Sequence, residues 1–104
     1  MNENDIVALM RAADMLKAMS NPYRLSILCM LGDGEHTVTE LTEFTGLSQS
    51  ALSQHLARLR ARDLVSTRKN HQNVYYTLKS EEVKEVIATL HKLYCGDIGN
   101  EDGA

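Results

Sequence analysis

The segment from Ser48 to Arg60 reads SQSALSQHLARLR and constrains the fold more than any other part of the chain. Its apolar residues recur every three to four positions, as on one face of a helix, and most of its polar residues fall off that face. The apolar set is Ala51, Leu52, Leu56 and Leu59, and the polar set is Gln49, Ser50, Ser53, Gln54 and Arg58. Since serine suits the N-cap position, we predict an amphipathic helix that begins at Ser48.

The residues before this helix favour a DNA-binding role for its polar face. Taken alone, that face fits either an ordinary solvated surface or contact with base edges, which amides, hydroxyls and guanidinium groups can read. However, Thr37–Glu40 resembles a helix N-terminus, Leu41 and Phe44 follow at helical spacing, and Gly46 breaks the pattern. Two short helices joined by a tight turn with glycine are typical of a helix-turn-helix.

The polar residues of the second helix divide by chemistry into two predicted roles. Gln49, Ser50, Ser53 and Gln54 are candidates for reading bases, because they donate and accept hydrogen bonds. Arg58 is a candidate phosphate contact, which positions a protein on DNA without specifying sequence. Arg60 could contact phosphate or pair with a nearby acid.

A β-hairpin is predicted directly after this helix. Leu64–Lys69 and Val74–Leu78 are rich in Val, Thr and Tyr, and the polar residues 70–73 lie between them. Such a hairpin after a recognition helix is a wing. Three residues are expected at its tip, within reach of phosphate or a minor groove: Arg68, Lys69 and His71.

Three further helices complete the expected architecture. The first runs from Asp5 to Met19, the second from about Pro22 to Leu31, and the last from a Ser80 cap to Gly96. We predict one α+β, mostly helical, winged helix-turn-helix domain over residues 1–104, with 96–104 as a flexible acidic tail. The apolar stripes of the first and last helices are expected to form the interface of a homodimer.

The distribution of charge fits a DNA partner better than the total does. The net charge is -3, but residues 36–79 carry six Lys or Arg against three Asp or Glu. The flanking segments are both acidic. With a basic centre between acidic ends, one face of the domain can approach the phosphates of DNA, while the acidic segments are repelled by them.

The ends and the composition also bear on location. No apolar run is as long as a membrane span, and the first five residues, MNEND, lack the features of a secretory signal. We therefore expect a cytoplasmic protein.

Cys29 and Cys95 permit three interpretations. They could be buried thiols that pack as small hydrophobic groups. They could be a redox pair, if the second and last helices lie side by side. They could also bind a metal with His91, although structural zinc sites normally take four ligands. A permanent disulfide is not expected where thiols are kept reduced.

The order helix, helix, helix-turn-helix, wing, helix resembles the ArsR/SmtB family of winged-helix repressors. The similarity covers about residues 10–95 and rests on LKAMSNPYRLSIL at 16–28, LSQSALSQHL at 47–56, and DLV at 63–65 leading into VYYTL at 74–78. The chain departs from the metal-sensing members, because 39–44 contain no cysteine pair and the last helix offers only His91. The cysteine pair instead resembles that of the branch that responds to sulfide, persulfide and related oxidants.

This resemblance implies a repressor whose Cys29–Cys95 di- or polysulfide bridge weakens its grip on a palindromic operator. Reactive sulfur species or an oxidant would then be the inducer, and no cofactor or metal is expected. A metal-responsive repressor and a winged helix used only for protein contacts remain the alternatives. An enzyme is not expected, because no set of nucleophile, base and orienting residue is visible.

Overall fold

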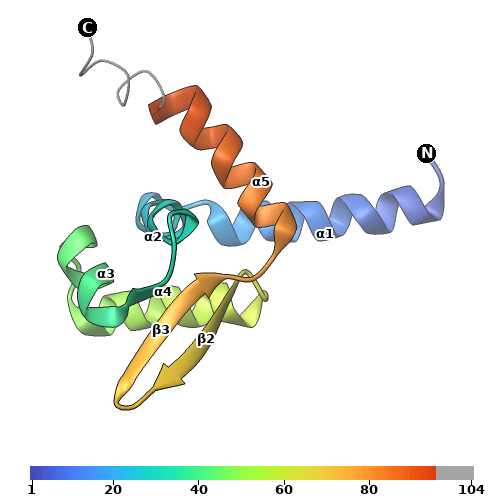
Figure 1. Cartoon of the computed structure of the whole chain (residues 1–104). Helices are drawn as coiled ribbons and strands as arrows, with labels where there is room; N and C mark the ends of the chain where they lie inside the picture. The colour runs from blue at the N-terminus through green and yellow to red at the C-terminus, as the bar shows by residue number, and fades with distance from the viewer. Residues whose placement is uncertain (96–104) are drawn as a thin grey trace, which may run out of the picture.

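The computed structural model describes residues 1–95 of the 104-residue chain. Its elements in chain order are α1 (Glu3–Met19), α2 (Pro22–Gly32), β1 (His36–Thr37), α3 (Val38–Thr45), α4 (Gln49–Ala61), β2 (Val65–Asn70), β3 (Asn73–Leu78), α5 (Glu81–Leu90) and the π-helical turn η1 (His91–Cys95). Figure 1 shows a block formed by α2, α3, α4 and the hairpin, from which α1 and α5 extend in different directions. The predicted winged helix-turn-helix is confirmed.

Side-chain caps explain where the helices begin. The Asn2 side chain accepts from the Asp5 backbone N–H at 2.9 Å, so α1 starts two residues before the predicted Asp5. Thr37 and Glu40 form the expected reciprocal capping box at the start of α3. Ser48 caps α4 through the Ala51 N–H at 3.2 Å, and Ser80 caps α5 in the same way. These boundaries therefore follow from local hydrogen bonds.

The turn of the helix-turn-helix depends on Gly46. Its φ of 74° lies in the left-handed region, and its N–H donates to the Thr42 carbonyl at 2.9 Å to close α3. A side chain at this position would be strained, whereas glycine adopts the conformation readily. The glycine thus sets the angle at which α4 leaves α3.

The sheet has three strands, in the order β1-β3-β2, where the sequence predicted two. All pairs are antiparallel, and β1 adds His36 opposite Tyr76 and Thr37 opposite Tyr75. A two-residue strand has no periodicity that a sequence can display, and its pairing depends on β3, some forty positions later. The hairpin turn is also shorter than predicted, because Asn70 pairs with Asn73 and only two residues connect the strands.

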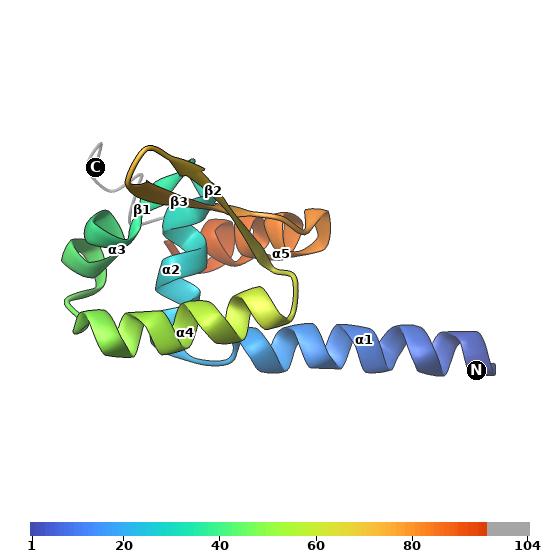
Figure 2. The same cartoon turned by 90° about the horizontal axis from the view of Figure 1, so that it is seen from below.

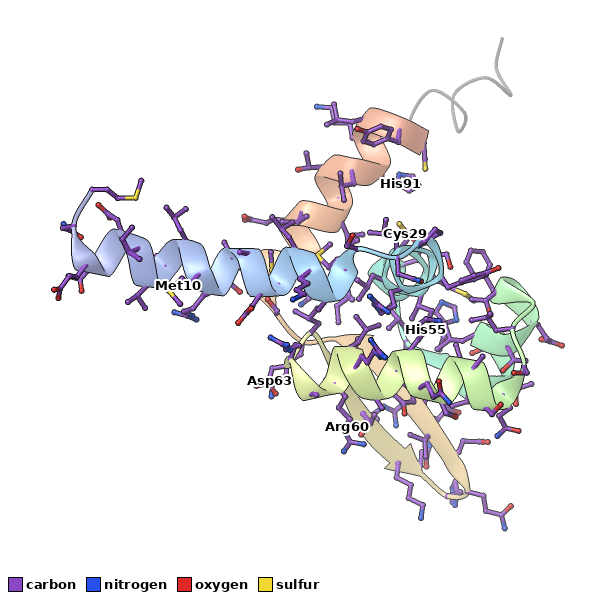
Figure 3. All side chains as sticks on the ribbon, turned by 180° about the vertical axis from the view of Figure 1, so that it is seen from behind. Met10, Cys29, His55, Arg60, Asp63 and His91 are labelled. Atoms are coloured by element: carbon purple, nitrogen blue, oxygen red, sulfur yellow. The ribbon has the colours of Figure 1, made fainter. Side chains whose placement is uncertain are left out.

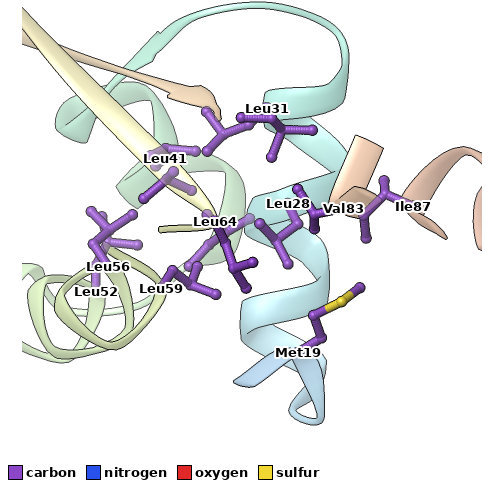
Figure 4. Packing of buried hydrophobic residues seen from close by; sticks show 13 residues of the cluster. Met19, Leu28, Leu31, Leu41, Leu52, Leu56, Leu59, Leu64, Val83 and Ile87 are labelled. Atoms are coloured by element: carbon purple, nitrogen blue, oxygen red, sulfur yellow. The ribbon is translucent and has the colours of Figure 1, made fainter. Parts of the chain in front are cut away.

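Aliphatic side chains from α2, α4, α5 and the hairpin form the core, with one residue from α1 and one from α3 (Figure 4). The buried residues are Met19, Ile27, Leu28, Leu31, Leu41, Leu52, Leu56, Leu59, Leu64, Val65, Leu78, Val83 and Ile87. Leu52, Leu56 and Leu59 confirm the predicted apolar face of α4. Phe44, which follows Leu41 at helical spacing, is 55% exposed.

The first helix makes little use of this core. Only its last turns, through Met15, Ala18 and Met19, pack on the domain, and residues 3–14 are exposed. The predicted apolar stripe lies on a different face of the helix, and its large side chains stay open to solvent. Those side chains include Ile6, Leu9, Met10 and Leu16, which are 47–64% exposed.

Within residues 1–95, none of the helices combines the length and the apolar character that crossing a membrane requires.

Leu28 is completely buried at the centre of the core, so Leu28→Ala is expected to lower the free energy of unfolding by about 2–5 kcal/mol. Urea titration at one fixed protein concentration measures this change. The matched control is Phe44→Ala, which removes an exposed side chain and should change stability by less than about 0.5 kcal/mol. Equal losses in the two variants would contradict the assigned core.

Candidate DNA interface and thiol site

The polar face of α4 is open to solvent. All five side chains predicted to contact DNA from this helix are exposed: Gln49, Ser50, Ser53, Gln54 and Arg58. Within residues 1–95, Gln49, Ser53 and Gln54 have no side-chain hydrogen bond. In Figure 2, α4 lies between the hairpin on one side and α1 on the other. The helix therefore presents unpaired donors and acceptors on one face of the molecule.

The wing contains two kinds of basic residue. Lys69 pairs with Val74, one step behind the turn that contains His71, and both side chains are exposed. Arg68 lies farther back than expected, opposite Tyr75, with its guanidinium carbon 4.6 Å from that ring centroid. Lys69 and His71 are thus near the tip, and Arg68 is nearer the body of the hairpin.

Arg68 is also engaged within the chain. Its Nε and Nη2 atoms donate to the two carboxylate oxygens of Glu35, each at 2.6 Å. The hydrogen bond from Arg68 lowers the pKa of the Glu35 carboxyl, and the same bond raises the pKa of Arg68. In this conformation the guanidinium holds the wing to the segment after α2. The sequence did not predict this pair, because its members are 33 positions apart.

The two tyrosines of β3, Tyr75 and Tyr76, lie on opposite faces of the strand. The ring of Tyr75 contacts the guanidinium group of Arg68, whereas Tyr76 packs against the core. Tyr76 also lines a hollow beside α4 together with Ser53 and Arg60. Arg60 has no ion pair within residues 1–95, so the alternative of a local acid partner is not observed there.

His55 lies where α4 meets the start of α2. It is half-buried, and its Nδ1 atom is 3.4 Å from Arg24 Nη1, while its ring stacks on Tyr23. Burial lowers the pKa of His55, and the positive charges of Arg24 and Arg58 lower it further. We therefore assign His55 to the packing of α4 against α2 and not to the set of base-reading residues.

Cys29 and Cys95 line one cavity, although 66 positions separate them in the chain. The cavity has a volume of about 440 Å³ and lies between α2 and the end of α5. Leu25, Ile87 and Leu90 form apolar walls, and His91 and Tyr94 complete it. Both cysteines are free and partly exposed, so small molecules can reach them. Figure 3 shows His91 and Cys29 in this region, where α5 passes over α2.

A second and larger hollow also reaches Cys29. Its volume is about 650 Å³, and it includes Asp33, Glu35, Lys84 and His91. The interpretation of Cys29 as a fully buried core thiol is therefore not supported, because the side chain borders two open spaces.

The environment of Cys29 disfavours its thiolate. Burial raises the pKa of the thiol, and the nearby Cys95 and Asp33 raise it further. Because the thiolate is the reactive form, this environment slows the reaction of Cys29 with electrophiles. The effect of Cys95 on this pKa also reflects the closeness of the two side chains.

The metal interpretation has no geometric support in the described part of the chain. Within residues 1–95, no three His, Cys, Asp or Glu side chains are grouped so that they could hold a metal ion. Cys29, Cys95 and His91 share a cavity but do not form such a group. Gly96 and the predicted flexible tail at 96–104 lie outside the described residues.

Comparisons with known proteins agree with this architecture. Residues 21–67 match the family described as bacterial regulatory protein, arsR family. The transcriptional activator HlyU of Vibrio cholerae is 60% identical over 85 residues, which cover 82% of this chain and 79% of that protein. The biofilm growth-associated repressor of Xylella fastidiosa is 36% identical over 83 residues, covering 80% of this chain and 73% of the repressor.

Solved structures give the same result. Reduced HlyU from Vibrio cholerae superposes with a TM-score of 0.87 at 54% identity, covering 90% of this chain and 99% of that one. The homodimeric winged helix-turn-helix DNA-binding domain of Mb0332 from Mycobacterium bovis superposes with a TM-score of 0.79 at 26% identity, covering 94% and 91%. These relatives are regulators, which agrees with the expectation that the chain is not an enzyme. The extent of identity over most of both sequences places this chain in the ArsR family of bacterial regulatory proteins.

Proposed function

We propose that this chain is a homodimeric repressor that binds a palindromic operator and releases it when Cys29 and Cys95 become bridged by sulfur. The observation that carries the sensing step is the single cavity shared by the two thiols. The exposed polar face of α4 and the exposed wing residues Lys69 and His71 support the DNA-binding step.

Two exposed surfaces support a homodimer. On α1, the stripe containing Ile6, Leu9 and Leu16 has no partner within the described subunit. On η1, Leu93 and Tyr94 are 66% and 73% exposed. Contiguous apolar surfaces of this kind mark protein interfaces, and the relative Mb0332 is described as homodimeric. A two-fold dimer would present two α4 helices to half-sites about one DNA turn apart.

The bridging chemistry needs a donor of reactive sulfur. The Cys29 thiolate attacks the outer sulfur of a low-molecular-weight persulfide, RSSH, giving Cys29–SSH and releasing RS⁻. The Cys95 thiolate then attacks the Sγ atom of Cys29 and expels HS⁻, which leaves a disulfide. If Cys95 has also become a persulfide, the Cys29 perthiolate attacks Sγ of Cys95 and expels HS⁻, which leaves a trisulfide.

The length of the bridge affects its geometric demands. A direct disulfide needs Cα atoms no more than about 7 Å apart, and each inserted sulfur relaxes that limit. A bridge would tie η1 to α2 and so constrain α5, an element that we place at the dimer interface. Because both α4 helices must match the spacing of successive major grooves, a small change at the interface reduces specific affinity.

Gln54→Ala is expected to reduce discrimination between the operator and a scrambled duplex by about 1–3 kcal/mol for each half-site, because it removes one predicted base contact per subunit. Fluorescence anisotropy with an operator selected from random duplexes by the wild-type protein measures both affinities. Asn4→Ala removes an exposed amide from the far end of α1 and should leave the ratio unchanged. A Gln54→Ala protein with wild-type discrimination would remove Gln54 from the set of base-reading residues.

Persulfide treatment is expected to link Cys29 to Cys95 within one subunit and to weaken operator binding at least about tenfold, which is 1.4 kcal/mol. Mass spectrometry of peptides identifies the bridge by the loss of two hydrogens, with one sulfur added for each inserted atom. Cys29→Ser and Cys95→Ser should keep operator affinity after treatment. A bridge that forms without a loss of affinity would refute its coupling to DNA, and the absence of a bridge would refute the sensing step.

Leu9→Arg is expected to shift the protein from dimer to monomer, because it places a charge in the exposed apolar stripe of α1. Light scattering after size-exclusion chromatography measures the mass at several concentrations. Ala8→Arg adds the same charge to a different face of α1 and should leave the dimer intact. A Leu9→Arg protein that stays dimeric would exclude this stripe from the interface.

A further inference from the structure

A groove beside α4 gathers four cationic side chains in a chain whose net charge is negative. Its volume is about 510 Å³, and it lies where the end of α1, the start of α2 and the C-terminal half of α4 meet. The cationic residues are Lys17, Arg24, Arg58 and Arg62. The remaining lining residues, Ala18, Ser20 and Ala61, are small, so the groove is open between the charges.

Three helices hold these charges in place. Arg58 belongs to the last turns of α4, Arg62 is the C-cap residue that follows this helix, and both line the groove. Arg24 donates from Nε to the Ala18 carbonyl at 2.5 Å, so its guanidinium is anchored at the junction of α1 and α2. Lys17 belongs to the last turn of α1. The groove is thus assembled by the tertiary fold.

Little negative charge offsets these four groups. Asp14 is the one acid that forms an ion pair with any of them within residues 1–95, with its Oδ2 atom 3.4 Å from Arg62 Nη1. The positive field extends to the neighbouring His55, whose pKa is lowered by burial and then by Arg24 and Arg58. A groove lined by one sign of charge raises the local concentration of ions of the opposite sign, so the arrangement points to an anionic ligand.

The groove adjoins the helix proposed to read DNA. In Figure 2, α4 separates the end of α1 from the hairpin, so the groove lies on the opposite side of α4 from the wing. A duplex that places its major groove on α4 carries one phosphate backbone along each side of that helix. One backbone passes toward the wing, and the other passes toward this groove.

We propose that the groove formed by Lys17, Arg24, Arg58 and Arg62 binds the phosphodiester backbone of the duplex whose major groove receives α4. This inference rests on the proposed DNA-binding function and adds to it a second, sequence-independent line of contact that includes α1 and α2. It also assigns a role to Lys17 and Arg62, neither of which belongs to the predicted wing or base-reading set. The end of α1 would then touch DNA while the exposed stripe of the same helix touches the second subunit.

The test compares two double variants with the same change of charge. Lys17→Gln with Arg62→Gln removes two cations from the groove, and Lys79→Gln with Lys84→Gln removes two that lie outside it and pair with Asp63 and Glu81. Affinity for the selected operator and for a duplex of arbitrary sequence is measured by fluorescence anisotropy at several salt concentrations. The slope of log affinity against log salt should fall by about one for each phosphate that the protein no longer neutralises.

Because the proposed dimer carries the groove twice, the groove variant should lose about four from that slope, two for each subunit, and bind both duplexes at least about tenfold more weakly at low salt, while the control pair keeps the wild-type slope. Asp14→Asn removes the ion pair with Arg62 but keeps all four cations, so it should retain the slope, which separates the charge from the ion pair. Circular dichroism melts confirm that each protein is folded. A groove variant with the slope of the control pair would overturn the proposal.

Two further outcomes separate this proposal from its alternatives. Inorganic phosphate, titrated while amide shifts are followed by NMR, should cause no saturable change in the groove. Saturable phosphate binding together with an unchanged duplex slope would reassign the groove to a free anion and overturn the proposal. A wild-type protein that binds neither duplex would instead refute the DNA-binding function itself.

Discussion

The packing of α2 through the centre of the domain is the interaction on which the rest of the structure depends. Ile27 and Leu28 are fully buried, and α2 contacts α1, α3, α4, α5 and β3. Since protein interiors are close-packed, a shift of this helix is felt by all of its neighbours. Cys29 directly follows Leu28, so the candidate sensing thiol belongs to the element that holds the recognition helix and the wing in place.

This placement gives the proposed switch a physical basis. The wing is tied to the segment after α2 by the Glu35–Arg68 pair, and α4 is tied to the start of α2 through Arg24, Tyr23 and His55. A bridge to Cys95 would add a constraint between α2 and η1 at the opposite side of the helix. The polar face of α4, the wing and the thiol cavity are thus all connected to α2. The cavity also involves α5, which belongs to the proposed dimer interface. The raised pKa of Cys29 lowers the fraction of its thiolate, which slows its reaction with electrophiles.

The helix α1 links three surfaces. Its last turns pack on the domain through Met19, and Lys17 belongs to the cationic groove. Its apolar stripe around Leu9 is exposed and is the surface that we propose to contact the second subunit. A helix with residues 3–14 exposed gains little from its own subunit, and short isolated helices are marginal in water. Its stability therefore depends on the second subunit in the dimer that we propose.

Local chemistry in the sequence determined the helix boundaries, the glycine turn, the apolar face of α4 and the hairpin, because caps, periodicity and turn preferences act over a few residues. The family resemblance supplied the role of the cysteines, but no pattern in the residues places Cys29 beside Cys95. Only the tertiary structure decided that proximity, and it alone decided the strand His36–Thr37, the Glu35–Arg68 pair and the groove around Lys17 and Arg62. Each of these joins segments that are distant along the chain, and their meeting depends on how the core closes around α2.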